Sequence, residues 1–196
     1  MHDNSSILVN QEVDAFTELV QSDSTLLADQ DVAAFLSEEL QDVKLTLLLK
    51  NVTSLLHEDR ESQVFAELTT VRWDVVALNE TWRETKEETW TIAGHLFLGS
   101  GGSKGSNGVA VILHRRWAKG FQSFKAVSDR VCSVDVNINE RRLRFIAVYM
   151  PTAWHPEAAA DGVYTELTGL YCEARRLKRT VILLGDFNAG KTRPGK

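Results

Sequence analysis

Short apolar runs alternate with longer amphipathic segments from residue 45 onward, and this alternation constrains the fold more than any other feature. An apolar run at residues 45–49 is followed by a segment at 58–71 and a second apolar run at 75–78. Such short runs are typical of buried strands, and the segment between them has the three- and four-residue spacing of a helix. That helix is predicted to face inward through Val64, Phe65, Leu68 and Val71. The alternation predicts an α/β sheet protein.

The second half of the chain continues the pattern. Residues 131–138 alternate as a half-buried strand, with Cys132, Val134, Val136 and Ile138 on one face and Ser133, Asp135 and Asn137 on the other. Asn139 and Glu140 supply a turn before the next strand at 143–150, which predicts an antiparallel hairpin. A helix is expected at 157–178 and a strand at 180–184. The glycine-rich stretch 99–108 has the composition of a linker, but a strand follows at once, so a surface loop within one domain is expected.

Charge divides the chain near residue 42. Residues 1–42 hold ten acids and no Lys or Arg, and because the whole chain carries −5, residues 43–196 carry +5. Two short amphipathic patterns, at 13–20 and 32–40, make residues 1–42 an acidic leader, helical or disordered, outside the domain at 43–196. A mildly basic domain suits a polyanionic substrate, but many proteins of this charge bind none.

Composition also excludes several classes. The apolar runs are far shorter than the roughly 20 residues that cross a bilayer, and the first residues lack the features of a secretory signal. An intracellular protein with no membrane partner is expected. The two cysteines, Cys132 and Cys172, form no CxxC or Cys/His cluster, so neither a zinc site nor a disulfide-linked partner is expected.

Polar residues able to do chemistry stand at the ends of four predicted strands. They are Asn51, Glu80, Tyr149, and Asp186 with Asn188. Sites gather at strand ends because rigid strands fix loops that a ligand can reach. Each residue alone has another explanation: Asn51 as a turn former, Tyr149 as a core aromatic, and Asp186 with Asn188 as an Asx turn. Their recurrence predicts one shared site.

Two of these strand ends point to specific chemistry. Glu80 continues a strand face with Val76 and Leu78, beside apolar surface where an unpaired charge is costly, so a bound Mg²⁺ would offset that cost. The alternative is a surface Glu that caps the next helix. Asp186 and Asn188 flank Phe187 and point to the same side if the segment stays extended. A carboxylate and an amide side by side can orient a water and hold a phosphate oxygen, which phosphodiester hydrolysis requires.

Residues 185–192 also read GDFNAGKT, a match to the phosphate-binding loop pattern GxxxxGK[ST] after a strand. Such a loop needs a following helix whose N-terminus faces the phosphates. Only four residues follow Thr192, and Asp186 would place a negative charge against the polyphosphate. An NTP-binding protein is therefore a minor alternative.

Six segments in order resemble the endonuclease/exonuclease/phosphatase (DNase I-like) family. They are NVTSL at Asn51, LNETW at Glu80, NGVAVIL at Asn107, VSDRV at Ser128, VYMPT at Tyr149 and LLGDFNA at Asp186. The likeness is strongest to endonuclease domains of non-LTR retrotransposons and to craniofacial development protein 2-like proteins. The resemblance implies a four-layer α/β sandwich, incomplete at the C-terminus, of which residues 43–196 would be the first two thirds.

The resemblance also implies roles. Glu80 with Asn51 would hold Mg²⁺, with Mn²⁺ as the alternative ion, and Tyr149 would contact the scissile phosphate. Asp186 with Asn188 would orient the attacking water or help to hold the metal ion. Arg130 would bind a substrate phosphate, with an ion pair to a neighbouring carboxylate as the alternative. Nucleic acid, with DNA preferred, is the implied partner, and a nuclear location follows if the retrotransposon likeness holds.

The departure from the family pattern bears on activity. Family members carry a further Asp and then a Ser-Asp-His motif, and neither is present in these 196 residues. Loss of one member of a catalytic set often costs on the order of 10³ in rate, so weak activity is expected. A non-catalytic remnant or binding fragment is the second hypothesis. The absent part would also supply strands, which predicts an exposed sheet edge and poor solubility.

Overall fold

The computed structural model divides the chain into two units, Met1–Lys44 and Leu45–Lys196, and describes residues 44–102, 106–152 and 154–188. The two predicted leader helices lie outside the described residues. The first sheet contains β1 (Leu47–Asn51), β2 (Val75–Asn79), β5 (Val109–Leu113), β4 (His95–Ser100) and β3 (Glu88–Ile92), in that order. The second contains β6 (Phe121–Ala126), β7 (Val131–Ile138), β8 (Arg141–Tyr149) and β9 (Thr180–Asp186). The helices are α3 (Glu58–Thr69), α4 (Glu157–Arg176) and the short 3₁₀ helix η1 (Ala118–Gly120).

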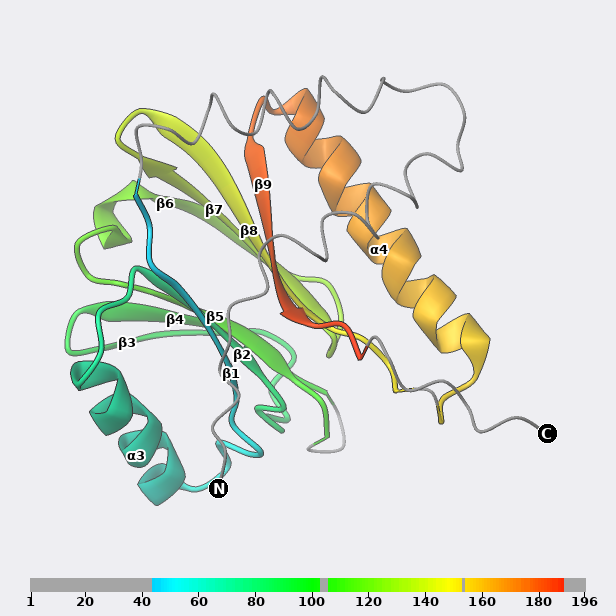
Figure 1. Cartoon of the computed structure of the whole chain (residues 1–196), viewed down its shortest axis with the longest axis horizontal. Helices are drawn as coiled ribbons and strands as arrows, with labels where there is room; N and C mark the ends of the chain where they lie inside the picture. Colours follow the sequence, from blue (N-terminus) through cyan, green and yellow to red (C-terminus); the bar gives the residue numbers. More distant parts are fainter. Residues whose placement is uncertain (1–43, 103–105, 153, 189–196) are drawn as a thin grey trace. The chain divides into compact units, whose positions relative to one another are not determined.

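The elements of this unit form four layers, as the resemblance implied. The two sheets pack face to face, α3 covers the outer face of the first sheet, and α4 covers the outer face of the second (Figure 1). The parallel pairs are β1 with β2 and β8 with β9, and the other pairs are antiparallel. Parallel pairing aligns the carboxyl ends of the two partner strands at one edge of each sheet, which matters for the site below.

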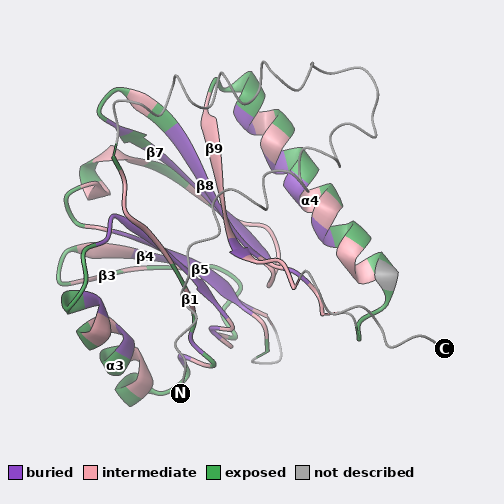
Figure 2. Cartoon of the chain, in the orientation of Figure 1, coloured by how far each residue is buried: buried purple, intermediate pink, exposed green. Residues whose placement is uncertain are grey.

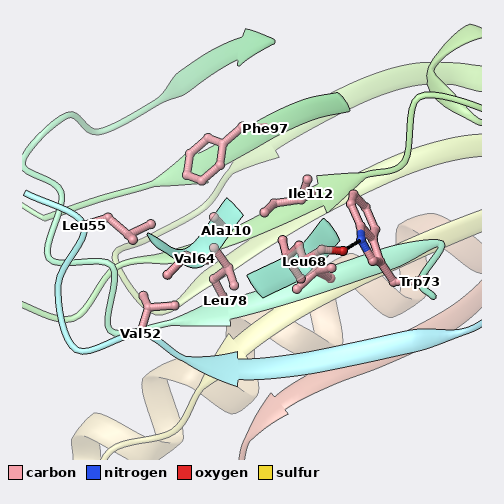
Figure 3. Close-up of a cluster of buried hydrophobic side chains, with 10 residues drawn as sticks. Val52, Leu55, Val64, Leu68, Trp73, Leu78, Phe97, Ala110 and Ile112 are labelled. Carbon is pink, nitrogen blue, oxygen red and sulfur yellow. Dashed lines mark hydrogen bonds between the residues drawn. The ribbon is translucent and has the colours of Figure 1, made fainter. Parts of the chain in front are cut away.

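The first core layer lies between α3 and the first sheet. Figure 3 shows Val64 and Leu68 of α3 among the side chains of β2 and β5, with the Trp73 Nε1 donating to the Leu68 carbonyl at 2.9 Å. Phe65 is partly buried and contacts the Trp90 ring at 5.8 Å between centroids. Val71 is 51% exposed, because the helix ends at Thr69, so the prediction that Val71 faces inward is wrong.

Strand β7 is buried on both faces, so its interpretation as a half-buried strand is wrong. Ser133 and Asp135 are 3% and 4% exposed, because α4 covers the face that the alternation assigned to solvent (Figure 2). Asp135 accepts two hydrogen bonds from Arg144, at 2.6 Å to Nε and 2.9 Å to Nη2. Arg144 also donates to the Leu170 carbonyl and to Glu173 on α4. The polar residues on this face of β7 therefore form buried ion pairs that hold α4 against the second sheet.

The predicted hairpin is confirmed. β7 and β8 pair antiparallel along their whole length, and Asn139 and Glu140 connect them with φ angles of +46° and +68°. Two consecutive left-handed residues are the signature of a type I′ turn, which matches the twist of the strands. β4 and β5 pair in one sheet on either side of the glycine-rich stretch, so that stretch joins strands of a single domain.

Strand β9 lies at the edge of the second sheet, and most of its residues are only partly buried. Among the described residues, no other strand pairs with its outer edge. Within the same residues, no helix has the length and apolar character needed to cross a bilayer.

Candidate active site

The structure brings together the polar residues that end β1, β2 and β8. Glu80 Oε1 accepts a hydrogen bond from Asn51 Nδ2 at 2.6 Å and another from the Tyr149 hydroxyl at 3.0 Å. Glu80 and Tyr149 are 69 positions apart and belong to different sheets. The structure therefore brings three of the residues that the sequence predicts to share a site within hydrogen-bond distance of one another.

Strand pairing explains why these residues meet. In the first sheet, Asn51 pairs with Asn79, the residue before Glu80. In the second sheet, Tyr149 pairs with Asp186. Each parallel pair brings its two carboxyl ends to the same edge, and face-to-face packing then brings the two edges together.

The segments that follow β1 and β2 leave their strands side by side. The amides of Val52, Ser54 and Leu55 donate in turn to the carbonyls of Asn79, Glu80 and Thr81, at 3.0, 2.7 and 2.8 Å. Thr53, Ser54 and Glu80 have φ angles of +47°, +92° and +56°. Left-handed residues other than glycine are uncommon and persist where the surroundings fix them. The Glu80 backbone is therefore held in one position.

The left-handed conformation also corrects one prediction. Glu80 was expected to continue the face of β2 with Val76 and Leu78, but β2 ends at Asn79 and the positive φ of Glu80 breaks the alternation. The carboxylate is therefore partly exposed at the sheet edge instead of lying against the apolar face.

A third segment, before β5, supports the same loop. Thr81 N donates to the Gly108 carbonyl at 3.1 Å, and Trp82 N donates to the Asn107 carbonyl at 2.8 Å. Gly108 has a φ of +86°, and a Cβ there would overlap the Thr81 hydroxyl. Glycine is required at this position both for the backbone angle and for the close approach.

Asp186 and Asn188 form a turn, which the sequence offered only as their alternative explanation. Asn188 N donates to Asp186 Oδ1 at 2.9 Å, and Asn188 has a φ of +48°. The extended segment assumed for this pair is therefore wrong. Asn188 Nδ2 donates to the Met150 carbonyl at 2.6 Å, which fixes the turn against the end of β8. The turn keeps Asp186 beside Tyr149 in the sheet register.

Asn79 is a site residue that the sequence reasoning missed. It is 1% exposed, at the end of β2 facing the second sheet. With the amide oriented so that its oxygen meets a donor, that oxygen accepts from Asp186 N at 2.8 Å. This bond links the two sheets directly beneath the cluster. The sequence feature that could have indicated it is an amide side chain at the end of an apolar run, because a buried amide needs a hydrogen-bond partner.

Arg130 lies on the outer side of Tyr149. Its guanidinium carbon is 5.2 Å from the Tyr149 ring centroid, and its Nη1 donates to the Tyr149 carbonyl at 3.3 Å. Among the described residues, no carboxylate forms an ion pair with Arg130, so the alternative explanation for it has no support there. Its Nη2 lies 3.3 Å from His155 Nε2, and His155 Nδ1 lies 3.0 Å from Thr152 Oγ1. His155 therefore reaches the edge of the cluster, which its loop position did not indicate.

Tyr149 is a hydrogen-bond donor at neutral pH. Burial, followed by the hydrogen bond and charge of Glu80, raises the pKa of Tyr149 to about 12, although the nearby Arg130 lowers it. The charge of Asp186 also raises this pKa, which places Asp186 within electrostatic reach of the hydroxyl. A protonated phenol at this point can donate to a phosphate oxygen.

The donor set fits a hard divalent cation in part. One carboxylate oxygen of Glu80 accepts the hydrogen bonds from both Asn51 and Tyr149. No lysine or arginine among the described residues forms an ion pair with Glu80. Asn51 turns its nitrogen toward Glu80 and its oxygen toward Thr53 N at 3.1 Å, so it would have to rotate to bind a metal. Among the described residues, no group of three or more His, Cys, Asp or Glu side chains forms a metal cage. One or two carboxylates with substrate phosphate is the usual Mg²⁺ arrangement.

A pocket of about 310 Å³ lies in the loops beside the cluster, lined by Glu84, Lys86, Gly101, Gly102, Ser128 and Asp129. Its wall is tied to the Glu80 loop, because Gly108 N donates to the Asp129 carbonyl at 2.8 Å. None of the sequence-predicted site residues lines it. For the alternative phosphate-binding loop, Gly185 and Asp186 belong to β9, and residues 189–192 lie outside the described part of the chain.

Comparisons with known proteins bear on the family and the fold of this chain. The family model for the endonuclease/exonuclease/phosphatase family matches residues 43–195. The similar solved structures include a variant of the 3′ phosphatase NExo from Neisseria bound to product DNA hairpin, with a TM-score of 0.53 and 20% identity over 76% of this chain and 60% of that one. The 3′-5′ exonuclease NExo from Neisseria meningitidis gives 0.52 and 22% over 72% and 57%. The human Nocturnin catalytic domain with bound sulfate gives 0.52 and 17% over 74% and 64%.

At these low identities the structural likeness shows a shared fold alone, and the chain spans about 60% of the length of the solved chains. No curated protein sequence matches the chain. The two-sheet α/β sandwich is the fold of these structures, and the family model covers nearly all of residues 43–196. This chain belongs to the endonuclease/exonuclease/phosphatase family.

Proposed function

We propose that the chain carries the phosphodiester-hydrolysing site of a metal-dependent nuclease, with nucleic acid, and DNA in preference, as its substrate. The observation that carries the proposal is the set of hydrogen bonds at Glu80, whose carboxylate receives neutral donors from Asn51 and Tyr149 and no cation among the described residues. A partly exposed carboxylate kept without a positive partner is ready to bind one.

Each residue of the cluster has a role in this proposal. Glu80 holds Mg²⁺ or Mn²⁺, with Asn51 orienting its carboxylate, and the ion supplies charge that polarises the phosphate and stabilises the leaving oxygen. Arg130 donates to phosphate oxygens, and Tyr149 does so when its single hydroxyl proton leaves Glu80, because a phenol with a raised pKa and a guanidinium both remain donors at neutral pH. Asp186 accepts a proton from the attacking water, and Asn188 fixes the turn that positions it.

The finer assignment follows the sequence motifs. We infer an endonuclease of non-LTR retrotransposon type, or a craniofacial development protein 2-like relative, acting in the nucleus, because all six motifs occur in that order. The domain is assigned to residues 43–196, after the acidic leader. Turnover by the 196-residue chain is expected to be slow, because the Asp and Ser-Asp-His motifs of the family are absent from its sequence.

The test is nicking of supercoiled plasmid by the 196-residue chain at high concentration, with MgCl₂ or with EDTA. We expect slow nicking in MgCl₂, none in EDTA, and a loss of about 10² or more in rate for Glu80→Gln. Glu87→Gln is the matched control, because Glu87 is an exposed glutamate of the next loop and the same charge is removed.

The outcomes separate the alternatives. Equal nicking by wild type and Glu80→Gln would mean a contaminating nuclease and would remove the support for the proposal. No nicking by wild type, with DNA binding retained, would favour the binding fragment. Nucleotide binding that disappears in Lys191→Ala would instead favour the phosphate-binding loop.

A further inference from the structure

Positive charge gathers at the end of the second sheet opposite the candidate site. Three segments form this end: η1 with residues 118–121, the β7–β8 hairpin at 137–142, and the last turn of α4 with residues 174–180. Together they hold seven lysine and arginine residues and one acid, Glu140, and a second acid, Glu173, directly precedes the third segment and pairs with Arg144 and Lys125. The six cations considered below, called the basic end, are Lys119, Arg142, Arg175, Arg176, Lys178 and Arg179.

Asn137 joins the three segments into one surface. Arg179 Nη1 donates to Asn137 Oδ1 at 3.4 Å and to the Leu143 carbonyl at 3.3 Å, which places the chain after α4 against the hairpin. Arg142 pairs with Asn137 in the strand register. η1 adjoins the same residue, because a Cβ at Gly120 would overlap the Asn137 carbonyl. The cations are therefore held on rigid elements.

Most of these charges face solvent without a carboxylate partner in the described structure. Lys119, Arg142, Arg175, Arg176 and Lys178 are exposed, and Figure 2 colours parts of the hairpin and of the last turn of α4 as exposed. Arg179 is the exception, because its Nε lies 3.0 Å from Asp135. Asp135 also pairs with Arg144, so the buried carboxylate is shared between two arginines.

Helix capping explains only part of this charge. Cations in the last turn of a helix complement its dipole, which accounts for Arg175 and Arg176. Arg142 lies on a strand and Lys119 on η1, so neither faces a long helix end. The positive charges that helix capping does not explain, those of Arg142 and Lys119, are available to attract a polyanion.

We propose that the basic end is a second nucleic-acid-binding surface, which takes the phosphate backbone of a segment away from the candidate site. Four of its six cations are arginines, whose planar fork pairs with phosphate oxygens. Arg142 and Tyr149 are seven residues apart on β8, a separation of roughly 23 Å at about 3.3 Å per residue. That distance equals about seven base pairs of duplex. A duplex must therefore be longer than about seven base pairs to reach both surfaces.

The chemistry favours nucleic acid over an anionic membrane. A membrane-binding surface normally adds several apolar side chains that enter the lipid. In the three segments, Leu177 is the one large hydrophobic residue that is strongly exposed, at 46%. This surface goes beyond the proposed catalytic function, since it uses none of the residues of the candidate site.

The experiment measures binding of a fluorescein-labelled 30-base-pair duplex by anisotropy in EDTA, where metal-dependent cleavage does not occur. The triple variant Arg142→Gln/Arg175→Gln/Arg176→Gln is expected to bind at least about tenfold more weakly at roughly 0.1 M salt. The slope of log K against log salt should fall by about 2 to 3, because each phosphate that the protein no longer neutralises removes about 0.9 from it.

The matched control is Lys44→Gln/Lys50→Gln/Lys125→Gln, which removes the same charge from scattered positions, and it should keep affinity within about threefold. The catalytic proposal is tested by nicking in MgCl₂ and this one by duplex binding in EDTA, so the two proposals fail separately. Equal weakening in both triple variants would reduce the effect to net charge and overturn the proposal. Unchanged affinity in the first triple variant, or competition by phosphatidylserine vesicles at similar charge concentration, would overturn it too.

Discussion

Two pairs of carboxylates in this protein have opposite surroundings. The interior pair, Asp74 and Asp135, is almost fully buried, and both members are bonded to arginine. The strand-end pair, Glu80 and Asp186, is partly exposed and receives only neutral donors among the described residues. The interior pair is satisfied within the fold, and the proposed function assigns the strand-end pair to binding of metal and water.

The interior pair shows what complete satisfaction requires. Asp74 accepts hydrogen bonds from Thr46 N at 2.8 Å, from Arg116 Nε at 2.6 Å and from the Trp117 indole. Burial alone would raise the pKa of Asp74, but these hydrogen bonds and the Arg116 charge together lower it. Arg144 has a raised pKa because it bonds to Asp135 and Glu173. Where the fold needs a buried charge, it supplies several partners.

The largest expected effect is the stability difference between the two pairs. Asp135→Ala should lower the free energy of unfolding by about 3–5 kcal/mol, because Arg144 is then buried with only part of its partners. Glu80→Ala should change it by about 1 kcal/mol or less, since Glu80 loses only two neutral hydrogen bonds. Urea unfolding of both variants measures this. An equal loss of unfolding free energy in Glu80→Ala would show that Glu80 is a structural residue, and the proposed difference between the two pairs would then be wrong.

Replacement of Asp135 together with its partner Arg144 sharpens the test. Asp135→Leu/Arg144→Met removes the buried charges together, so it should recover much of the stability that Asp135→Ala loses. A double variant as unstable as Asp135→Ala would show that the altered packing against α4, and not the unpaired charge, sets the cost.

The second effect is stabilisation by metal, which the proposed function assigns to the strand-end pair. Mg²⁺ at ten times its dissociation constant should raise the free energy of unfolding by about 1.4 kcal/mol if the native state alone binds it. Thermal unfolding with and without MgCl₂ should show this shift in wild type and in Glu87→Gln, and not in Glu80→Gln. A shift that persists in Glu80→Gln would place the ion elsewhere and remove Glu80 from the metal role.

The sequence was enough to predict that Asn51, Glu80, Tyr149 and Asp186 meet. Each follows or ends an apolar run, and parallel strands bring such ends together. The backbone at those ends was not predictable from the same pattern. The positive φ of Glu80 and the turn at Asn188 depend on bonds to Ser54 and Met150, from other segments.

The interior pair shows the other limit of sequence reasoning. Asp135 was assigned to solvent because alternation along β7 reveals only that its two faces differ. Whether the polar face is exposed depends on α4, which begins well after β7 along the chain. The Asp74–Arg116 pair spans 42 positions and has no local signature. Long-range polar partners are set by tertiary packing, and a single sequence does not show them.

The smallest expected effect is a loss of stability at acidic pH. It tests whether the interior near Asp74 depends on neutral side chains as well as on ion pairs. Close to Asp74, the Trp73 ring lies 4.8 Å from His95 and 4.9 Å from His114, between centroids. Burial lowers the pKa of both histidines, and neighbouring charges lower them further: His114 and Arg115 for His95, and Arg116 and Arg115 for His114. Their ring Nδ1 atoms accept from the amides of Arg115 and Arg116, at 3.1 and 3.2 Å, which holds both rings neutral.

The sign of the pH dependence follows from these lowered pKa values. As pH falls below about 6.5, the unfolded chain takes up protons on these histidines before the folded chain does, so the free energy of unfolding decreases. It should stop decreasing from this cause once the pH is below the lowered pKa values of the folded state. Urea unfolding at pH 7.5 and 5.5 should show the loss in wild type, and His95→Gln/His114→Gln should lose less between the same two pH values. If the double variant keeps the whole wild-type pH dependence, the acid sensitivity comes from the carboxylates, and the neutral stack on Trp73 has no part in it.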